Sequence, residues 1–232
     1  MFLNSKKILA IIPARAGSKR LPKKNTLPLC GKPLINWTIE ETLKSKYIDK
    51  IVVSSDDSNI LDIIKNYPIN YINRKKSLST DTATTVDVVL DVINQQNEKY
   101  DYIILLQPTS PLRTVQDIDN AFELLLRKNA LSIISMCETD HPIQWCTKLD
   151  RNNCIDNFTE NIDTQRSQDQ EIHYRLNGAI YLIKTDEFTR QKSFFSNKKN
   201  YAYIMNKQNS IDIDDKFDFN LAEYIKKTQN FE

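Results

Sequence analysis

Short apolar runs rich in branched residues recur along the first two thirds of the chain and alternate with longer amphipathic segments. The runs are ILAII, KIVVSS, INYI, DYIILL and LSIISM, at residues 8–12, 50–55, 69–72, 101–106 and 131–136. Helical periodicity marks the segments between them, at residues 33–46, 58–67, 84–96 and 115–128. Strands that alternate with helices of about ten or more residues predict an α/β fold with a doubly wound, mainly parallel sheet.

The alternation stops between about residues 138 and 175, where the chain is polar. We interpret this segment as an inserted arm and not as a disordered loop, because it keeps apolar side chains that can be buried, namely Ile143, Trp145, Phe158 and Tyr174. Regular structure is expected to resume with a strand at 177–183 and a helix at 217–228. The 232 residues are therefore predicted to form a single domain, residues 1–232, with one inserted arm.

Composition limits the class of protein. The formal net charge is only +2, which does not suggest a general nucleic-acid binder or a membrane-surface protein. The four cysteines form no C-x-x-C pair, as expected of free thiols in a cytosolic protein. The apolar run near the N-terminus is too short for a signal sequence, and no segment approaches the roughly 20 apolar residues of a membrane span. We therefore expect a cytoplasmic protein with no membrane partner.

Polar segments follow four of the predicted strands. They are PARAGSKRLPKKN, SSDD, NRKKSLSTDTATT and QPTSPLR. In doubly wound sheets, ligands bind in the crevice outside the carboxyl ends of the strands, so these segments are expected to form one site.

The first of these segments, residues 13–25, carries five cationic side chains, Arg15, Lys19, Arg20, Lys23 and Lys24. Gly17 permits close approach to the backbone, and Ser18 adds a hydroxyl group. Such a loop suits a polyphosphate, although it contains no Walker A motif. A lysine-rich stretch is more often a solvated surface loop, but its position after the first strand favours phosphate binding.

Two carboxylates near the C-terminus could balance this charge. Asp212 and Asp214 alternate with isoleucines in SIDIDDKFD, so an extended backbone directs both carboxylates to one side. Paired carboxylates suit Mg²⁺. Taken alone, D-x-D is a weak motif that is more often a solvated strand end or a helix cap, and this is the part that we expect Asp215 and Asp218 to play.

Neutral and basic side chains in the other segments suit a nucleoside or a sugar. Arg74 could pair with an anion or a base edge, and a cluster of threonines sits where a helix would begin, at Thr82, Thr84 and Thr85. Gln107, at a strand end, can both donate and accept hydrogen bonds. Arg113 is interpreted as a structural ion-pair residue.

The motifs IIPARAGSKRLPKKN, IVVSSDD, LSTDTATT, LLQPTSPLR, YRLNGAIYL and SIDIDDKFD together resemble a known family. It is that of the cytidylyltransferases that activate nine-carbon sugar acids, the CMP-sialic acid synthetases or N-acylneuraminate cytidylyltransferases and the related legionaminic and pseudaminic acid enzymes. The resemblance covers nearly the whole chain. The enzymes that activate the eight-carbon acid KDO have a similar opening, but KKN at the end of the loop and the later NGAIY resemble the sialic branch.

The resemblance implies a Rossmann-like nucleotidyltransferase that joins CTP to a nine-carbon sugar acid with Mg²⁺ or Mn²⁺, as a homodimer held by the arm. It assigns the triphosphate to Arg15, Lys19, Lys24 and Asn25 beside Ser18, with the first three catalytic. It assigns cytosine and ribose to Arg74, Ala83 and Thr85, and the metal to Asp212 and Asp214. The sugar acid is assigned to Gln107, Tyr174, Phe194, Phe195 and, in the arm, Arg166.

The sequence departs from the family pattern in the arm. A family-like RQ.LP before the tyrosine is replaced by QRSQDQEIHY, and a lysine expected after HP is replaced around Gln144. Both changes concern the sugar side and leave the identity of the acid open. Two further alternatives stay open, a KDO or sugar 1-phosphate nucleotidyltransferase and a nucleotide-binding module without catalysis.

Overall fold

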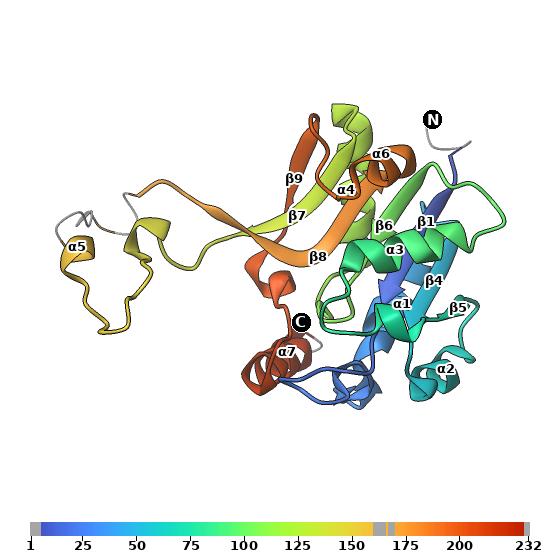
Figure 1. Cartoon of the computed structure of the whole chain (residues 1–232), viewed down its shortest axis with the longest axis horizontal. Coiled ribbons are helices and arrows are strands. Elements are labelled where there is room, and N and C mark those ends of the chain that lie inside the picture. Colours follow the sequence, from blue (N-terminus) through green and yellow to red (C-terminus); the bar gives the residue numbers. More distant parts are fainter. Residues whose placement is uncertain (1–5, 160–165, 167–169, 230–232) are drawn as a thin grey trace.

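The protein is built on a seven-stranded sheet with the strand order β5-β4-β1-β6-β8-β7-β9 (Figure 1). The structure is a computed structural model that describes residues 6–159, 166 and 170–229. The strands of this sheet are β1 (Ile8–Pro13), β4 (Lys50–Ser55), β5 (Asn70–Asn73), β6 (Tyr102–Leu105), β7 (Ser132–Glu138), β8 (Tyr174–Lys184) and β9 (Asn200–Ile204). Neighbouring strands are parallel except at β8, which runs antiparallel to β6 and β7. The prediction of a mainly parallel sheet is confirmed.

The helices are α1 (Leu34–Leu43), α2 (Ser58–Ile64), α3 (Thr85–Asn94), α4 (Val115–Lys128), α5 (Asp156–Thr159), α6 (Thr185–Gln191) and α7 (Lys216–Gln229). Helices α1, α2, α3, α4 and α7 lie where the sequence predicted them, and α5 and α6 are short additional helices. Thr84 and Thr114 begin α3 and α4 with capping boxes, in which each hydroxyl and the aspartate three residues later exchange hydrogen bonds with the backbone. Asn129, in the left-handed conformation, ends α4.

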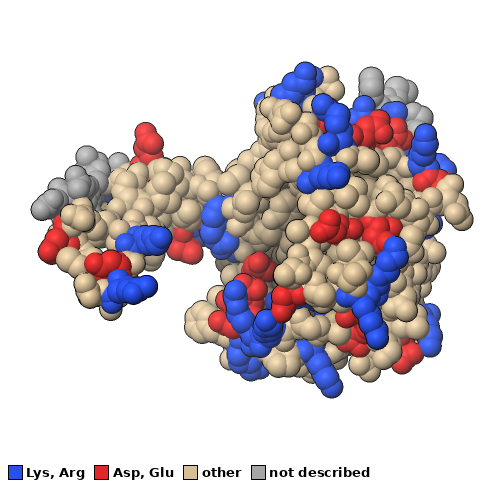
Figure 2. Space-filling view, viewed as in Figure 1, with Lys and Arg blue, Asp and Glu red and all other residues tan. Residues whose placement is uncertain are grey.

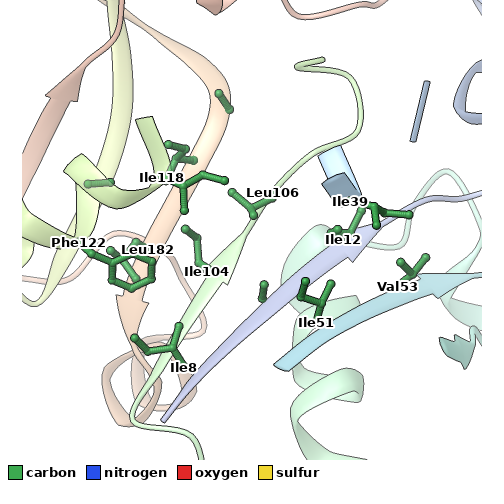
Figure 3. Packing of buried hydrophobic residues seen from close by; sticks show 14 of the residues in the cluster. Ile8, Ile12, Ile39, Ile51, Val53, Ile104, Leu106, Ile118, Phe122 and Leu182 are labelled. Atoms are coloured by element: carbon green, nitrogen blue, oxygen red, sulfur yellow. The ribbon is translucent and has the colours of Figure 1, made fainter. Parts of the chain in front are cut away.

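Both faces of the sheet are buried, because successive side chains of the central strand β1 point to opposite sides. Ile8 and Ile12 belong to the cluster that packs against α1, α2 and α4 (Figure 3). Leu9 and Ile11 belong to a second cluster, which contains residues of α3 and α6. The doubly wound arrangement follows from this alternation, and it leaves the carboxyl ends of the strands as the open edge of the sheet.

A third, smaller cluster connects the two ends of the chain. It joins the loop after β1 to the segment before α7 and to α7 itself through Leu21, Leu29, Leu112, Ile213 and Phe219. The loop also forms a short antiparallel ribbon of β2 (Pro28–Leu29) and β3 (Lys32–Pro33). Figure 1 shows α7 lying beside this early part of the chain. The C-terminal aspartates are thereby brought to the first loop.

The segment between β7 and β8 projects away from the body (Figure 1). Its described part contains α5 and a 3-10 turn at Ile143–Trp145, and β8 begins at Tyr174, three residues before the predicted strand. Several apolar side chains of this segment are exposed in the single chain, namely Ile143, Trp145, Leu149, Ile155 and Ile172. Residues 160–165 and 167–169 of the predicted arm lie outside the described residues.

Candidate active site

A cavity of about 480 Å³ lies at the carboxyl ends of the parallel strands. Four segments line it: the loop after β1, the segment between β5 and α3, the loop after β6, and the residues before α7. The sequence-predicted residues that line it are Arg15, Ser18, Lys19, Lys24, Asn25, Arg74, Ala83, Thr85, Gln107 and Asp214. The fold therefore brings together both the cationic and the neutral candidates from distant parts of the chain.

Backbone contacts fix the loop after β1. The Ala16 N–H donates to the Asp56 carboxylate at 2.8 Å, and the buried Asn25 amide donates to the Arg15 carbonyl at 3.0 Å. Gly17 is exposed, and a Cβ atom built there would meet no atom within 4 Å. Since the fold itself leaves this space open, the glycine is consistent with a ligand that approaches the backbone closely.

Two aspartates hold the cationic side chains of this loop. Lys19 and Arg15 contact the two oxygens of Asp81 at 2.6 and 3.1 Å. These contacts, led by the hydrogen bond from Lys19, hold the pKa of Asp81 below its ordinary value. Asp81 was not singled out in the sequence, since a lone aspartate in a polar loop carries no distinguishing pattern. All three side chains are well exposed, so such pairs are weak and a polyanion can replace them.

Asp214 is the second aspartate that holds cationic side chains of this loop. Its carboxylate lies 2.8 Å from Arg20 Nη1 and 3.6 Å from Lys24 Nζ. The Lys24 ammonium also donates to the carbonyl of Ile213 and is largely buried, with its side chain 11% exposed. The basic loop and the SIDID segment are therefore in direct contact.

Arg74 is a buried cation without a carboxylate partner among the described residues. Its guanidinium donates to the Ser54 carbonyl at 2.7 Å and to the Ser54 hydroxyl at 3.2 Å. Burial lowers its pKa from the ordinary value. A fixed guanidinium with neutral partners retains its charge and spare N–H groups for a ligand.

Ala83 and Thr85 line the cavity beside Arg74, at the start of α3. Thr84 between them caps the helix with its hydroxyl. One member of the threonine cluster is thus explained by capping, while the first turn of the helix faces the cavity.

Asp212 lies deeper than Asp214. One of its carboxylate oxygens, Oδ1, is buried and has no hydrogen-bond partner, and burial raises the pKa of this carboxyl. A Cβ atom built on Gly178 would lie 3.3 Å from Asp212 Oδ2 and 3.4 Å from Gln107 Oε1. The side chains of Gln107 and Asp212 therefore both approach β8 at Gly178.

These carboxylates fit a magnesium ion on chemical grounds. Mg²⁺ is commonly held by one or two carboxylates, while water and substrate phosphates supply the other ligands. Asp214 lines the cavity, Asp212 lies two residues before it in the sequence, and the unpaired Asp212 oxygen is a ready ligand. Within the described residues, no three His, Cys, Asp or Glu side chains are grouped to hold a metal, so the rest of the coordination must come from substrate and water.

The remaining sugar-side candidates do not line the cavity of a single chain. Arg166 is exposed in the arm, and Tyr174 is 44% exposed where β8 leaves the arm. Phe194 is buried in the core between Tyr181 and Phe188, with ring centroids 5.4 and 4.7 Å away. Its neighbour Phe195 is 50% exposed. The two phenylalanines thus do not form one aromatic surface here.

The interpretation of Arg113 as an ion-pair residue is wrong. No carboxylate lies within ion-pair distance of it in the described part of the chain, and its guanidinium donates to two carbonyls and a hydroxyl. The sequence shows the charge of an arginine but not which acceptors the fold places around it.

A family model described as cytidylyltransferase matches residues 9–231. The chain belongs to the cytidylyltransferase family. The match covers nearly the whole chain and includes every segment that lines the cavity.

Curated relatives of similar length include a CMP-N,N'-diacetyllegionaminic acid synthase of Legionella pneumophila, 36% identical over 94% of this chain and 96% of its own. A pseudaminic acid cytidylyltransferase of Campylobacter jejuni is 32% identical over 97% of this chain and 98% of its own. An N-acylneuraminate cytidylyltransferase of Escherichia coli is 34% identical over 97% of this chain but 53% of its own length. The chain therefore spans about half of that relative.

Solved structures show the same fold. A CMP:2-keto-3-deoxy-manno-octonic acid synthetase complexed with CTP superposes with a TM-score of 0.71, at 16% identity, over 96% of this chain and 99% of that one. Across the residues that the structure describes, no helix is long and apolar enough to cross a membrane. On the face seen in Figure 2, cationic and anionic side chains are interspersed over the body.

Asp212→Asn is expected to raise the melting temperature of the metal-free protein at pH 7, because it removes a buried charge with an unpaired oxygen. Burial raises the folded-state pKa, so the stability that the protonated carboxyl contributes is lost as the pH rises through that pKa. The difference between variant and wild type should therefore vanish below the ordinary value of 3.8. Thermal unfolding with a chelator present, at several pH values, measures it.

Asp215→Asn is the matched control, since Asp215 is exposed and accepts hydrogen bonds from the first N–H groups of α7. It should lower the melting temperature slightly at pH 7, because it keeps the cap but removes a negative charge at the N-terminus of α7. An Asp212→Asn protein no more stable than wild type at pH 7 would contradict the account of a strained buried carboxylate.

Proposed function

We propose that this protein is a cytidylyltransferase that joins CTP to a nine-carbon sugar acid and releases pyrophosphate. The observation that carries the proposal is the contact, across one cavity, between the cationic loop after β1 and the Asp212–Asp214 segment. Membership of the family and the names of the relatives support the nucleotide and the class of acid.

The proposed reaction is nucleotidyl transfer. The anomeric 2-hydroxyl of the sugar acid attacks the α-phosphorus of CTP and gives up its proton to solvent, the bond from that phosphorus to the bridging oxygen breaks, and pyrophosphate leaves. Positioning and charge neutralisation dominate such transfers, so little covalent chemistry is required of the protein.

The cations of the loop perform this neutralisation. Lys24 is the most buried of them, and its ammonium is held by the Ile213 carbonyl so that it stays at the cavity without a rigid ion pair. Arg15 and Lys19 extend from the same loop toward Asp81 and would turn to the departing pyrophosphate. Ser18 and Asn25 complete this wall of the cavity.

Asp212 and Asp214 would hold Mg²⁺, or Mn²⁺, which supplies Lewis-acid polarisation of phosphate oxygens when bound. The protein's contribution is the placement of these two carboxylates next to the cations of the loop after β1. Arg74, Ala83 and Thr85 would bind cytosine and ribose, because they line the cavity and offer a charged fork and backbone groups.

A panel of acids tests the function directly. CTP with N-acetylneuraminic, legionaminic, pseudaminic and KDO substrates should yield CMP-sugar and pyrophosphate for at least one nine-carbon acid. The legionaminic and pseudaminic acids are serious alternatives because relatives named for them match the chain over nearly its whole length. A rise in melting temperature with CTP but no pyrophosphate with any acid would identify a non-catalytic nucleotide-binding module instead.

Lys24→Ala is expected to lower turnover by on the order of 10²–10³ while the protein stays folded, because one preorganised charge at the phosphoryl centre is removed. Pyrophosphate release under saturating CTP measures this. Lys23→Ala is the matched control, since Lys23 lies next in sequence, is exposed and does not line the cavity. Equal turnover of the two variants would exclude Lys24 from the mechanism.

We further propose that the arm forms a homodimer. The support is the set of exposed apolar side chains on a projecting segment, which a single chain leaves in water. The sugar-side candidates Arg166 and Tyr174 lie on or beside this arm and not at the cavity of their own chain. A partner's arm would bring such residues to the site.

Leu149→Asp combined with Ile155→Asp should convert the dimer to a monomer, because both side chains are about half exposed on the arm, at 50% and 46%. Light scattering after size-exclusion chromatography measures the mass. Phe217→Asp, at a 75% exposed position on α7, is the control and should leave the dimer intact. A wild-type protein that is monomeric at micromolar concentration would contradict the proposal.

A further inference from the structure

Arg113 is the largest fully buried side chain of the described protein, with an exposed fraction of 1%. Its guanidinium donates to the Ala179 carbonyl at 2.7 Å, to the Thr38 hydroxyl at 2.8 Å and to the Gln107 carbonyl at 3.2 Å. Its Nε–H has no partner. Burial lowers the pKa of Arg113 to about 10, so the side chain remains charged at neutral pH.

Burying a cation in this position carries a large free-energy penalty. The acceptors around it are neutral, and the Asp117 and Glu41 carboxylates influence it only from beyond ion-pair distance. Burying a charge without a paired counter-charge destabilises a protein, and an apolar side chain of similar size would fill the same space without that penalty. What a guanidinium adds is a rigid, planar set of donors that fixes several acceptors relative to one another.

The acceptors that Arg113 fixes come from three elements, and one of them belongs to Gln107, which lines the cavity. One carbonyl is that of Gln107 itself, two residues after the end of β6, and the other is that of Ala179, directly after Gly178 on β8. The Thr38 hydroxyl, from α1, contacts the guanidinium and lies 3.4 Å from the same Gln107 carbonyl. Arg113 thus ties β6, β8 and α1 together beneath one side of the site.

Gly178, next to the Ala179 carbonyl that Arg113 binds, lies beside two of the proposed site residues. It has a φ of +74°, and the pairing of β7 with β8 is irregular between Ile134 and Met136. Its Cα faces both Asp212 Oδ2 and Gln107 Oε1. A shift of this irregular part of β8 would therefore displace the side chain that would bind the sugar acid and a carboxylate that would bind metal.

We propose that Arg113 is a positioning residue, which holds the Gln107 end of β6 and the Gly178 bend of β8 in the relative placement that the sugar acid requires. The proposal rests on the proposed function. It differs from a purely structural role because it predicts a larger effect on the sugar acid than on CTP. Gln107 would bind the sugar acid itself, whereas the proposed CTP contacts, apart from the metal on Asp212, come from other segments of the cavity.

Two buried threonines of α1 allow a matched test. Thr38 contacts Arg113, whereas Thr42, one turn later and equally buried, donates only to the Thr38 carbonyl of its own helix. Thr38→Val is expected to raise the KM for the sugar acid about tenfold and to leave the KM for CTP within about twofold, because one hydrogen bond of the tie is lost. Thr42→Val should match the wild type in both constants.

Arg113→Lys is the second variant of this test. It keeps the charge but not the planar fork, so kcat/KM for the sugar acid should fall about 100-fold while the CTP constant changes little. If that variant does not fold, as circular dichroism would show, the two threonine variants decide the question.

The outcomes separate this proposal from the proposed function. A wild-type protein that forms no CMP-sugar overturns both. An active wild type with equal constants for Thr38→Val and Thr42→Val overturns the positioning role alone, as does an Arg113→Lys variant whose losses for CTP and for the sugar acid are equal.

Discussion

The site depends on the two hydrogen bonds that the backbone of Ile213 makes. Its N–H donates to the Thr109 carbonyl at 2.8 Å, and its carbonyl accepts from the Lys24 ammonium, 189 residues earlier in the sequence. The Ile213 side chain is completely buried in the cluster that joins the first loop to α7. The burial of this apolar side chain thus fixes the position of the two flanking aspartates.

This arrangement explains how the loop after β1 tolerates its charge before any ligand binds. Asp81 holds Lys19 and Arg15, and Asp214 holds Arg20 and lies near Lys24. Exposed pairs of this kind contribute little stability, so they keep the cations oriented without opposing a triphosphate strongly. Four of the five cationic side chains that look unpaired in the sequence therefore lie beside an aspartate, and in our proposal CTP replaces these contacts.

Much of the fold could be predicted because periodicity is a local property. The runs 8–12 and 50–55 became β1 and β4, and α4 begins and ends where its pattern predicted. The strand β9 was missed because its NYAYI sequence is not an apolar run, and α6 because it is short and polar. Local sequence also gives no strand direction, so the antiparallel placement of β8 could not be foreseen.

The site could be predicted only as far as charge and loop position allow. Arg15, Lys24, Arg74 and Gln107 lie together as expected, because the carboxyl ends of parallel strands share one edge. The roles of Asp81 and Arg113 depend on which groups the tertiary fold places opposite them, and no local pattern encodes that.

The measurement that tests the central claim most directly is a crystal structure of the protein with CTP and Mg²⁺. The account predicts that the triphosphate lies between the loop after β1 and the metal on Asp212 and Asp214, with Asp81 released from Lys19 and Arg15. CTP bound elsewhere, or bound in the cavity with both aspartates distant from the metal and the Asp81 pairs intact, would contradict it.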